Sequence, residues 1–309
     1  SPMHVGALIT LDVPTDDRAS LAVKLRRHVA QRLPATPLLA RLIQAPDGHD
    51  SDVWADLAAA DLDWHVVEEQ GDDLLNAVAA RNMERLDLSR PPFRLHVWPR
   101  HGAFLLKVHH SVVDGIGFQE VMRLLSDEAH PAAPRTGDAA LPDAVTWRAL
   151  SEARFAAEEP ARQAQSAARK AALAALEAFK GERAETPVLK LSGPTSPRRS
   201  FVPLALPLAP FRQAAKALDA TVNDLFMACA SWALRDYLME IGDLPEAPLV
   251  VNSARSYRRA EHGAFGNRIV ALHPHLATHL PNPLDRLRAI QASMAAEMRR
   301  TPHDEALLD

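Results

Sequence analysis

The stretch that decides the fold is Phe104-Leu-Leu-Lys-Val-His-His-Ser-Val-Val-Asp-Gly-Ile-Gly117, an apolar run that ends on two adjacent histidines. An aspartate and a glycine follow in the pattern HHxxxDG, which comprises His109, His110, Asp114 and Gly115. Side chains on a strand alternate between its two faces, so the two imidazoles are expected to point in opposite directions. Only one of them can therefore enter a given cavity.

The face that carries His110 also carries the apolar side chains of Phe104, Leu106 and Val108. A histidine at the end of a strand, followed by a turn rich in glycine, is well placed to act as a general base near neutral pH. We take His110 as the candidate base. His109, on the opposite face, is then a structural or supporting histidine.

The composition is that of a globular protein. The 309 residues are 47% hydrophobic and 24% charged, which is enough for one large domain or two ordinary ones with a proper core. The net charge of −4 gives no basic excess, so nucleic acid is not expected as a partner. The single cysteine, Cys229, excludes a disulfide framework and fits a reducing compartment.

Hydrophobic periodicity divides the chain into two halves and a bridge: residues 1–130, 131–195 and 196–309. The expected strands are residues 3–11, 93–98, 103–109, 201–206, 249–252 and 269–273. Helices are expected around residues 21–33, 74–86, 118–125, 221–241 and 284–300. Strands mixed with helices in both halves predict α/β layers of the α+β sandwich kind, with a cleft between the halves.

The bridge combines a loop rich in proline and alanine at residues 131–142 with an alanine-rich helical stretch from Val145 to Lys180 that Pro160 interrupts. In the second half, Thr221-x-x-Asp224 has the form of a capping box at a helix start. The helix that follows is expected to bury Leu225, Cys229, Trp232 and Leu238.

The sequence offers no good nucleophile for a covalent intermediate and no metal motif. There is no G-x-S-x-G elbow, no H-E-x-x-H and no C-x-x-C. Ser111 adjoins His110, but neighbours on a strand point to opposite faces. Cys229 falls in the expected buried stripe of a helix, where an inert thiol is the favoured interpretation.

Several segments resemble the wax ester synthase/diacylglycerol acyltransferase family, within the larger chloramphenicol-acetyltransferase-like group that includes peptide-synthetase condensation domains. The HHxxxDG motif is common to the whole group. The segments that favour the lipid family are, in chain order, Pro2–Gly6, Leu86–Phe93, Leu191–Arg199, Thr221–Leu225 and Phe265–Arg268. They resemble its opening strand, its "LDRSRPLW" and "LNGPISPRR" stretches, its Asn-Asp motif and its "GNR" segment.

The resemblance implies a two-subdomain chloramphenicol-acetyltransferase-like fold. The family continues past the equivalent of Asp309, with a late Asn-Val-Pro-Gly-Pro-type motif that this sequence does not contain. The second subdomain is therefore expected to be incomplete in this chain. The remainder of the same polypeptide is expected to pack against residues 201–309.

The activity that the resemblance implies is transfer of a fatty acyl group from acyl-CoA to a long-chain alcohol or to diacylglycerol. Acyl-CoA is then a co-substrate, and neither a permanently bound cofactor nor a metal is expected. Two alternatives stay open: a relative that takes its acyl group from a carrier protein, and a relative that binds acyl chains without catalysis. A cytoplasmic location is expected, with peripheral attachment to the inner membrane face or to lipid inclusions left open.

The resemblance also suggests roles for single residues. Asp114 of the motif is expected to pair with an arginine and to hold the loop in shape, and Arg255 is the candidate partner. Asn223 and Asp224 match the family's Asn-Asp motif, which the resemblance places near the active site, and they are equally well explained as helix-capping residues.

Two further pairs have open roles. Arg198 and Arg199 are weak candidates for binding the phosphates of coenzyme A, and ordinary surface arginines are the alternative. Gly115 and Gly117 permit either close approach of a substrate or simply a tight turn.

Overall fold

The computed structural model describes residues 3–45, 52–127, 142–177, 186–194, 196 and 198–308. It divides into two compact units. The first comprises Ser1–Ala157, Ser196–Val202 and Arg258–Arg268, and the second comprises Glu158–Thr195, Pro203–Tyr257 and Ile269–Asp309. Within the described residues, no helix combines the length and the apolar character needed to cross a bilayer.

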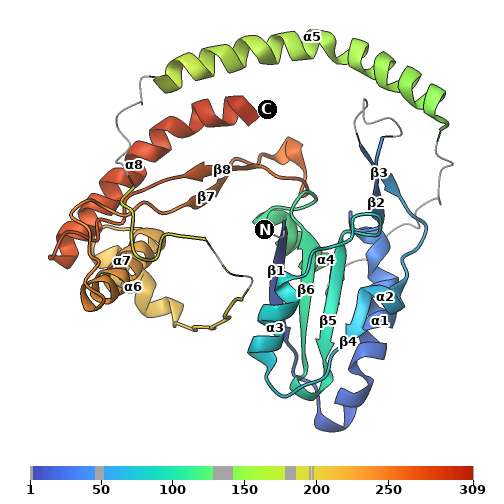
Figure 1. Cartoon of the computed structure of the whole chain (residues 1–309), viewed down its shortest axis with the longest axis horizontal. Coiled ribbons are helices and arrows are strands. Elements are labelled where there is room, and N and C mark those ends of the chain that lie inside the picture. Colours follow the sequence, from blue (N-terminus) through green and yellow to red (C-terminus); the bar gives the residue numbers. More distant parts are fainter. Residues whose placement is uncertain are drawn as a thin grey trace. The chain divides into compact units, whose positions relative to one another are not determined.

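A four-stranded sheet forms the centre of the first unit (Figure 1). Its strands, in spatial order, are β1 (His4–Thr10), β6 (Ala103–His109), β5 (Phe93–Trp98) and β4 (Val66–Glu68). Strand β6 pairs antiparallel with both β1 and β5, whereas β4 runs parallel to β5. The strands expected at residues 93–98 and 103–109 are confirmed, and they form a hairpin whose short turn contains Gly102 with a φ of 57°.

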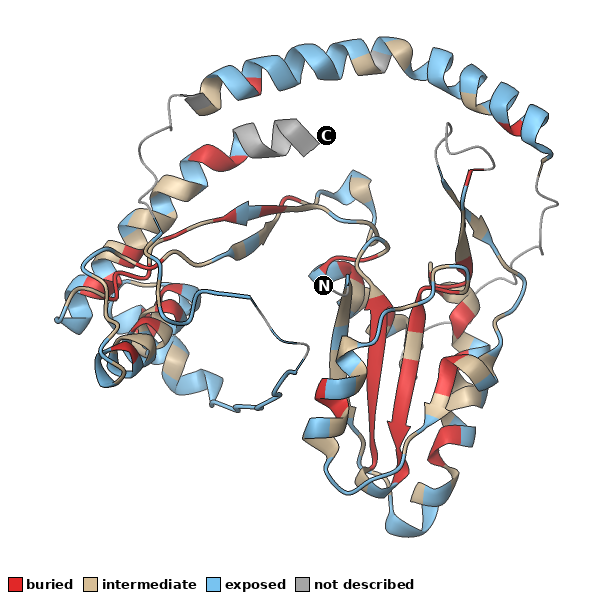
Figure 2. Cartoon of the chain, in the orientation of Figure 1, coloured by how far each residue is buried: buried red, intermediate tan, exposed pale blue. Residues whose placement is uncertain are grey.

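The two faces of this sheet are covered by different helices. On one face, α1 (Leu21–Arg32) and α4 (Gly115–Leu125) pack on the apolar side chains of β5 and β6. On the other face, α3 (Leu74–Met83) contacts Trp98 and Leu105. Figure 2 shows that β5 and β6 are buried along most of their length. The motif at the end of β6 therefore rests on the best-packed strand of the unit.

Lys107 is a buried cation on the α3 side of β6, with 1% of its surface exposed. Its ammonium group donates hydrogen bonds to the carbonyl oxygens of Arg81 and Glu84, at 2.6 and 2.5 Å. These carbonyls belong to the carboxyl end of α3, where a helix leaves its last acceptors unpaired. Burial lowers the pKa of Lys107 to about 8. Lys107 thus fixes α3 to the strand that carries the motif.

We expect Lys107→Met to destabilise the protein by about 1–3 kcal/mol, because the hydrogen bonds from its ammonium group to the carbonyls of Arg81 and Glu84 are lost. Chemical denaturation at a series of pH values measures this loss. Between pH 8 and 10.5 the unfolded chain holds a proton on Lys107 that the folded chain has released. The free energy of unfolding of the wild type therefore rises with pH in this window. The difference in stability between wild type and Lys107→Met should therefore increase from pH 8 to 10.5. A difference that decreases would contradict the burial of Lys107.

The remaining elements of the first unit are short. They are the strands β2 (Ala40–Ile43) and β3 (Val53–Asp56), which form a separate antiparallel pair, the helix α2 (Leu62–His65) and the 3-10 helices η1 (Thr15–Ser20), η2 (Leu33–Ala35), η3 (Pro99–His101) and η4 (Ala260–His262). The predicted loop at residues 131–142 lies almost wholly outside the described residues.

A long helix, α5 (Ala144–Glu177), contributes residues to both units. The prediction that Pro160 interrupts it is wrong, because the helix continues through this residue. A proline inside a helix removes one backbone hydrogen bond, but the sequence on both sides is rich in alanine, the residue with the highest helix propensity. Most of α5 is exposed (Figure 2).

Besides its part of α5, the second unit contains three helices and a two-stranded sheet among its described residues. These are α6 (Leu208–Ala217), α7 (Val222–Glu240), α8 (Pro283–Leu308), β7 (Ser253–Ser256) and β8 (Ile269–Leu272). The capping box that begins α7 is confirmed: Thr221 and Asp224 bond each other reciprocally. The strand expected at 249–252 begins instead at Ser253.

Two other expectations for this unit are wrong. Phe201–Leu206 is not assigned to any strand, and its alternate apolar residues are largely exposed. In α7, Met227, Ser231 and Leu238 are buried, whereas Cys229 and Trp232 are exposed. Helical geometry places positions 229 and 232 opposite the buried stripe. The helix has apolar residues on both faces, and the core that includes Ile290 of α8 covers only one of them.

Candidate functional site

The HHxxxDG motif forms the junction between β6 and α4. Strand β6 ends at His109, His110 begins the turn, and α4 begins at Gly115 with Asp114 as its N-cap. The alternation predicted along the strand is confirmed, because Phe104, Leu106 and Val108 all lie in the core under α1 and α4. The two imidazoles have separate partners.

His110 is held by the side chain of Asn267. The Oδ1 atom of Asn267 lies 2.8 Å from Nδ1 of His110, and the Nδ2 group of the same amide donates to the backbone carbonyl of His110. A carbonyl oxygen only accepts, so the amide must present Nδ2 to it and Oδ1 to the ring. Oδ1 is also only an acceptor, so Nδ1 of His110 must carry a hydrogen. In the neutral imidazole, Nε2 then keeps its lone pair. This is the form that a general base requires.

His109 has a different environment. Its Nδ1 accepts hydrogen bonds from the hydroxyl of Ser111, at 2.7 Å, and from the Ser111 backbone N–H, at 3.2 Å. Burial, followed by the nearby charge of His110, lowers the pKa of His109. Ser111 therefore does have a base beside it, which is His109 and not the adjacent His110. The pair is separated by two residues, however, and such local bonds from serine are common in turns.

Asp114 is completely buried and fully engaged. One carboxylate oxygen accepts from the backbone N–H of Gly117 at 2.8 Å, and the other accepts from the backbone N–H of Arg268 at 3.0 Å. The second oxygen also accepts from the guanidinium of Arg258 at 2.8 Å. Burial alone would raise the pKa of Asp114, but these three donors together bring it below its usual value. Its hydrogen-bond partners among the described residues do not include His110.

The predicted pairing of Asp114 with an arginine is confirmed, but the partner is Arg258 and not Arg255. Arg255 lies in β7, paired with Val270 of β8 in the second unit. Arg258 comes two residues after β7 ends, on the segment that folds with the first unit. Arg258, three residues after Arg255, thus supplies the guanidinium that contacts Asp114, whereas Arg255 stays in strand β7.

The segment 258–268 is attached to the motif by several further contacts. Val113 and Gly266 form an isolated parallel bridge, and the backbone N–H of Gly266 donates to the carbonyl of Val112 at 3.0 Å. Arg258 also donates to backbone carbonyls within its own segment, at residues 263, 265 and 266. Residues about 150 positions apart in the chain are therefore brought into one compact site.

Gly115 and Gly117 differ in what surrounds them. A Cβ on Gly117 would lie 3.1 Å from the backbone oxygen of Ala264, which is tighter than ordinary contact, so this glycine permits the close approach of segment 258–268. A Cβ on Gly115 would meet nothing within 4 Å. Steric crowding therefore explains Gly117 and leaves Gly115 without a packing role.

The other candidates have local partners or face solvent. Asn223 and Asp224 belong to the second unit, where Asp224 accepts from the backbone N–H of its N-cap residue and Asn223 is exposed. Arg198 and Arg199 are exposed, and Arg199 donates to the backbone carbonyls of Ser196 and Arg198. Their contribution to coenzyme A binding stays a prediction.

Sequence reasoning missed the roles of Asn267 and Arg258. The signal for Asn267 was present in the Phe265–Arg268 segment, which resembles the "GNR" of the family, but its contact with the base could not be read from spacing. For Arg258 the sequence has several arginines in one stretch, and nothing in their order separates the buried one from its neighbours.

Comparison with known proteins identifies the family of the chain. Residues 1–226 match the model of the wax ester synthase/diacylglycerol acyltransferase catalytic domain. The chain belongs to this family. A putative diacylglycerol O-acyltransferase of Mycobacterium tuberculosis is 28% identical over 325 residues, which cover 95% of this chain and 64% of that relative. The chain thus spans less than two thirds of the length of this relative.

Solved structures confirm the fold class. The wax ester synthase/diacylglycerol acyltransferase of Marinobacter aquaeolei VT8 matches with a TM-score of 0.63 at 24% identity, over 99% of this chain and 70% of that one. The first condensation domain of the CDA synthetase matches with a TM-score of 0.56 at 21% identity, over 97% and 70%. The chloramphenicol-acetyltransferase-like fold expected from the motifs is therefore present.

Proposed function

We propose that the protein transfers a fatty acyl group from acyl-CoA to the hydroxyl group of a long-chain alcohol or of diacylglycerol. The observation that carries this proposal is the bond between His110 and Asn267, which leaves Nε2 of the imidazole as a proton acceptor. Family membership supplies the substrate class, since mycobacterial relatives are named as diacylglycerol O-acyltransferases.

The chemistry follows from the properties of the two substrates. An alcohol is a poor nucleophile until a base removes its proton, whereas a thioester carbonyl is already activated by its leaving group. Nε2 of His110 accepts the hydroxyl proton while the alcohol oxygen bonds to the carbonyl carbon. The carbon–sulfur bond then breaks, and the imidazolium returns the proton to the departing thiolate. The products are an ester and free coenzyme A.

In this mechanism Asp114 acts at a distance. Its carboxylate caps α4 and holds segment 258–268, and that segment supplies Asn267. The buried pair with Arg258 therefore positions the base without exchanging a proton with it. This assignment agrees with the structural role expected for the motif's aspartate.

A covalent route through Ser111 is the second candidate, because His109 accepts a hydrogen bond from its hydroxyl. An activated serine normally depends on a base that a third group orients. No such third partner of His109 is found among the described residues, whereas His110 has Asn267. We therefore favour direct transfer, with both substrates bound together.

The experiment that tests the function is incubation of the full-length protein with palmitoyl-CoA, 1-hexadecanol and diacylglycerol in competition. We expect release of coenzyme A and formation of a wax ester, a triacylglycerol or both, separated by chromatography. Acyl transfer that occurs only from a carrier protein, or binding of palmitoyl-CoA without any ester, would exclude the proposed activity. The cytoplasmic location and the peripheral lipid attachment stay predictions.

We expect Asn267→Ala to lower turnover by about 10- to 100-fold, because a mispositioned base loses its alignment with the substrate. Asn267→Asp should recover part of the rate, since its carboxylate still accepts from Nδ1–H of His110. Asn76→Ala, at an exposed position on α3, is the matched control and should be silent. Steady-state kinetics measures turnover in the three variants. Unchanged turnover in Asn267→Ala would show that Asn267 does not position the base.

A further inference from the structure

A short loop of the second unit, residues 276–281 between β8 and α8, is held by two arginine side chains. Arg235 of α7 donates to the carbonyl oxygens of Thr278 and His279, at 2.8 and 3.1 Å. Arg286 of α8 donates to the carbonyl oxygens of the next two residues, at 2.6 and 3.0 Å. Both guanidinium groups therefore lie against the same stretch of backbone.

Arg286 is a buried cation without a carboxylate partner. Only 2% of its surface is exposed, and its partners within the described part of the chain are the two backbone carbonyls. Arg300 of the same helix, by contrast, contacts the carboxylate of Glu297 at 2.8 Å. Arginine is rarely buried this deeply unless it is paired, because removing an unpaired charge from water is costly. The charge of Arg286 therefore needs a counter-charge.

The electrostatic surroundings of Arg286 add to this need. Burial, followed by the charge of Arg235, lowers the pKa of Arg286. Asp236 acts in the opposite direction, but it is exposed, and among the described residues it forms no ion pair with either arginine. Burial, followed by the charges of Arg235 and His275, also lowers the pKa of His279. Positive charge thus gathers in one largely buried place.

Three polar atoms of this cluster have no hydrogen-bond partner in the described structure. They are Oγ1 of Thr278, Nδ1 of His279 and Nε of Arg286. The hydroxyl and the guanidinium Nε–H are donors, and the imidazole donates from Nδ1 in one of its neutral tautomers. Thr278 is completely buried, and buried donors without an acceptor are rare in folded proteins. All three atoms can be satisfied by one kind of partner, an acceptor.

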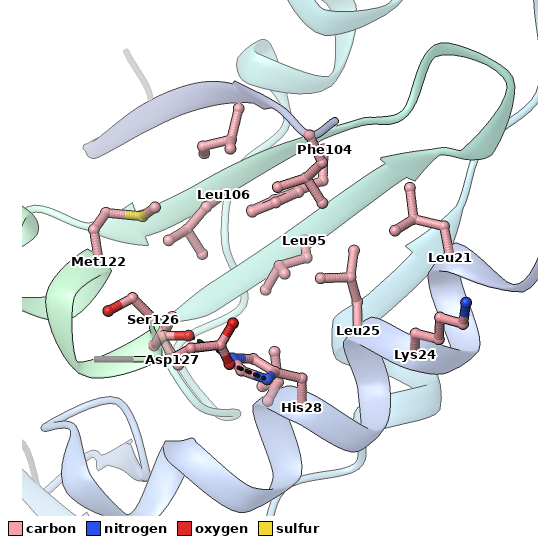
Figure 3. Close-up of a pocket in the computed structure, with 14 residues that line it drawn as sticks. Leu21, Lys24, Leu25, His28, Leu95, Phe104, Leu106, Met122, Ser126 and Asp127 are labelled. Atoms are coloured by element: carbon pink, nitrogen blue, oxygen red, sulfur yellow. Dashed lines mark hydrogen bonds and ion pairs between the residues drawn. The ribbon is translucent and has the colours of Figure 1, made fainter. Parts of the chain in front are cut away.

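The polar groups around an apolar cavity of the first unit differ in this respect (Figure 3). This cavity of about 460 Å³ lies between the sheet and the helices α1 and α4. At its mouth, the hydroxyl of Ser126 donates to the carbonyl of Arg123 at 2.7 Å. Nε2 of His28 donates to the carbonyl of Leu125 at 2.6 Å. Donors that are already satisfied do not indicate a ligand, whereas those of the loop 276–281 do.

The ligand that fits the loop is a small anion. Its charge offsets the two arginines, and it accepts hydrogen bonds without having to donate any. A water molecule would satisfy the donors and leave the charge unbalanced. Thr278 and Arg286 are 0% and 2% exposed, so the ion must be small and must lose most of its hydration shell. Dehydration is far more costly for a doubly charged ion, which favours a monovalent halide over sulfate or phosphate.

We propose that the loop 276–281, together with Arg235 and Arg286, binds one chloride ion. The ion accepts hydrogen bonds from Nε of Arg286 and Oγ1 of Thr278. Because Arg235 belongs to α7 and Arg286 to α8, the bound ion stabilises the packing of these two helices. The site lies within the second unit and does not depend on acyl transfer.

Bromide, which replaces chloride and scatters X-rays anomalously, tests the site in crystals of the full-length protein. Crystals soaked in sodium bromide should show an anomalous peak within hydrogen-bonding distance of Nε of Arg286 and Oγ1 of Thr278. In solution, the melting temperature should rise saturably as sodium gluconate is replaced by sodium chloride, since a ligand that binds only the folded state stabilises it. Constant ionic strength keeps the screening of charges equal throughout.

Two matched variants complete the test. Thr278→Val removes the unpartnered hydroxyl and should weaken chloride binding by about tenfold or more. Thr301→Val is the control, because Thr301 is also completely buried but its hydroxyl donates to the carbonyl of Glu297 at 3.2 Å. It should keep the wild-type chloride response.

Two results would overturn the proposal. One is the absence of a bromide peak from the site. The other is a chloride response that Thr278→Val leaves unchanged, which would mean an adventitious ion only even where the bromide peak is present.

Discussion

Replacement of His110 by alanine should reduce turnover at least a hundredfold while the protein stays folded. Deleting a positioned general base typically costs a factor of about 10²–10⁴ in rate. The side chain is partly exposed and makes one side-chain hydrogen bond, to Asn267, so its loss leaves little unsatisfied inside the fold. The change should therefore appear in kcat, measured with saturating acyl-CoA and alcohol, and not in the melting curve.

His109→Ala is the matched control for this prediction. The two histidines are adjacent, but His109 bonds Ser111 whereas His110 bonds Asn267. Its loss should cost much less than the loss of His110. If the two effects came out reversed, the base would be His109, and the Ser111 hydroxyl beside it would become the favoured nucleophile.

The second large effect is expected at Arg258. Breaking a buried ion pair by removing one partner typically costs about 3–5 kcal/mol, because the other charge is left uncompensated. Asp114 is completely buried, and 8% of the Arg258 side chain is exposed. We expect Arg258→Met to lose stability of this order in denaturant unfolding. Activity should fall with it, because segment 258–268 carries Asn267.

Arg255→Met separates the observed pairing from the one predicted by position in the sequence. It should leave the Asp114 network intact and cost distinctly less than Arg258→Met. Equal losses of stability in the two variants would contradict the assignment of Arg258 as the partner of Asp114.

The cost of Arg258→Met should also depend on pH. Three donors bring the pKa of the buried Asp114 carboxyl below its usual value, so the carboxylate contributes stability above its unfolded pKa of about 3.9. That contribution is lost as the pH falls through the lower, folded pKa. The difference in stability between wild type and Arg258→Met should therefore shrink in acid.

Local features of this fold could be predicted from the sequence. The strands β5 and β6, the capping box at Thr221 and the helix α4 all follow from side chains a few residues apart. Alternation along β6 correctly placed Phe104, Leu106 and Val108 on the core face. The physical reason is that these patterns depend on backbone periodicity, which short segments carry by themselves.

Contacts between distant segments could not be predicted in the same way. The choice of Arg258 over Arg255 depends on where β7 ends and the chain crosses to the first unit. The exposure of Cys229 depends on which of two apolar faces of α7 meets the core. The bond from Asn267 to His110 joins residues that are 157 positions apart.

Direct transfer with His110 as the base competes with a covalent route through the Ser111–His109 pair. The most direct measurement is the intact mass of the protein after mixing with palmitoyl-CoA in the absence of an acceptor. We predict unmodified protein, with ester formed only once 1-hexadecanol is added. A stable gain of one palmitoyl group that disappears in Ser111→Ala and passes to added alcohol would contradict the account and replace it with a covalent mechanism.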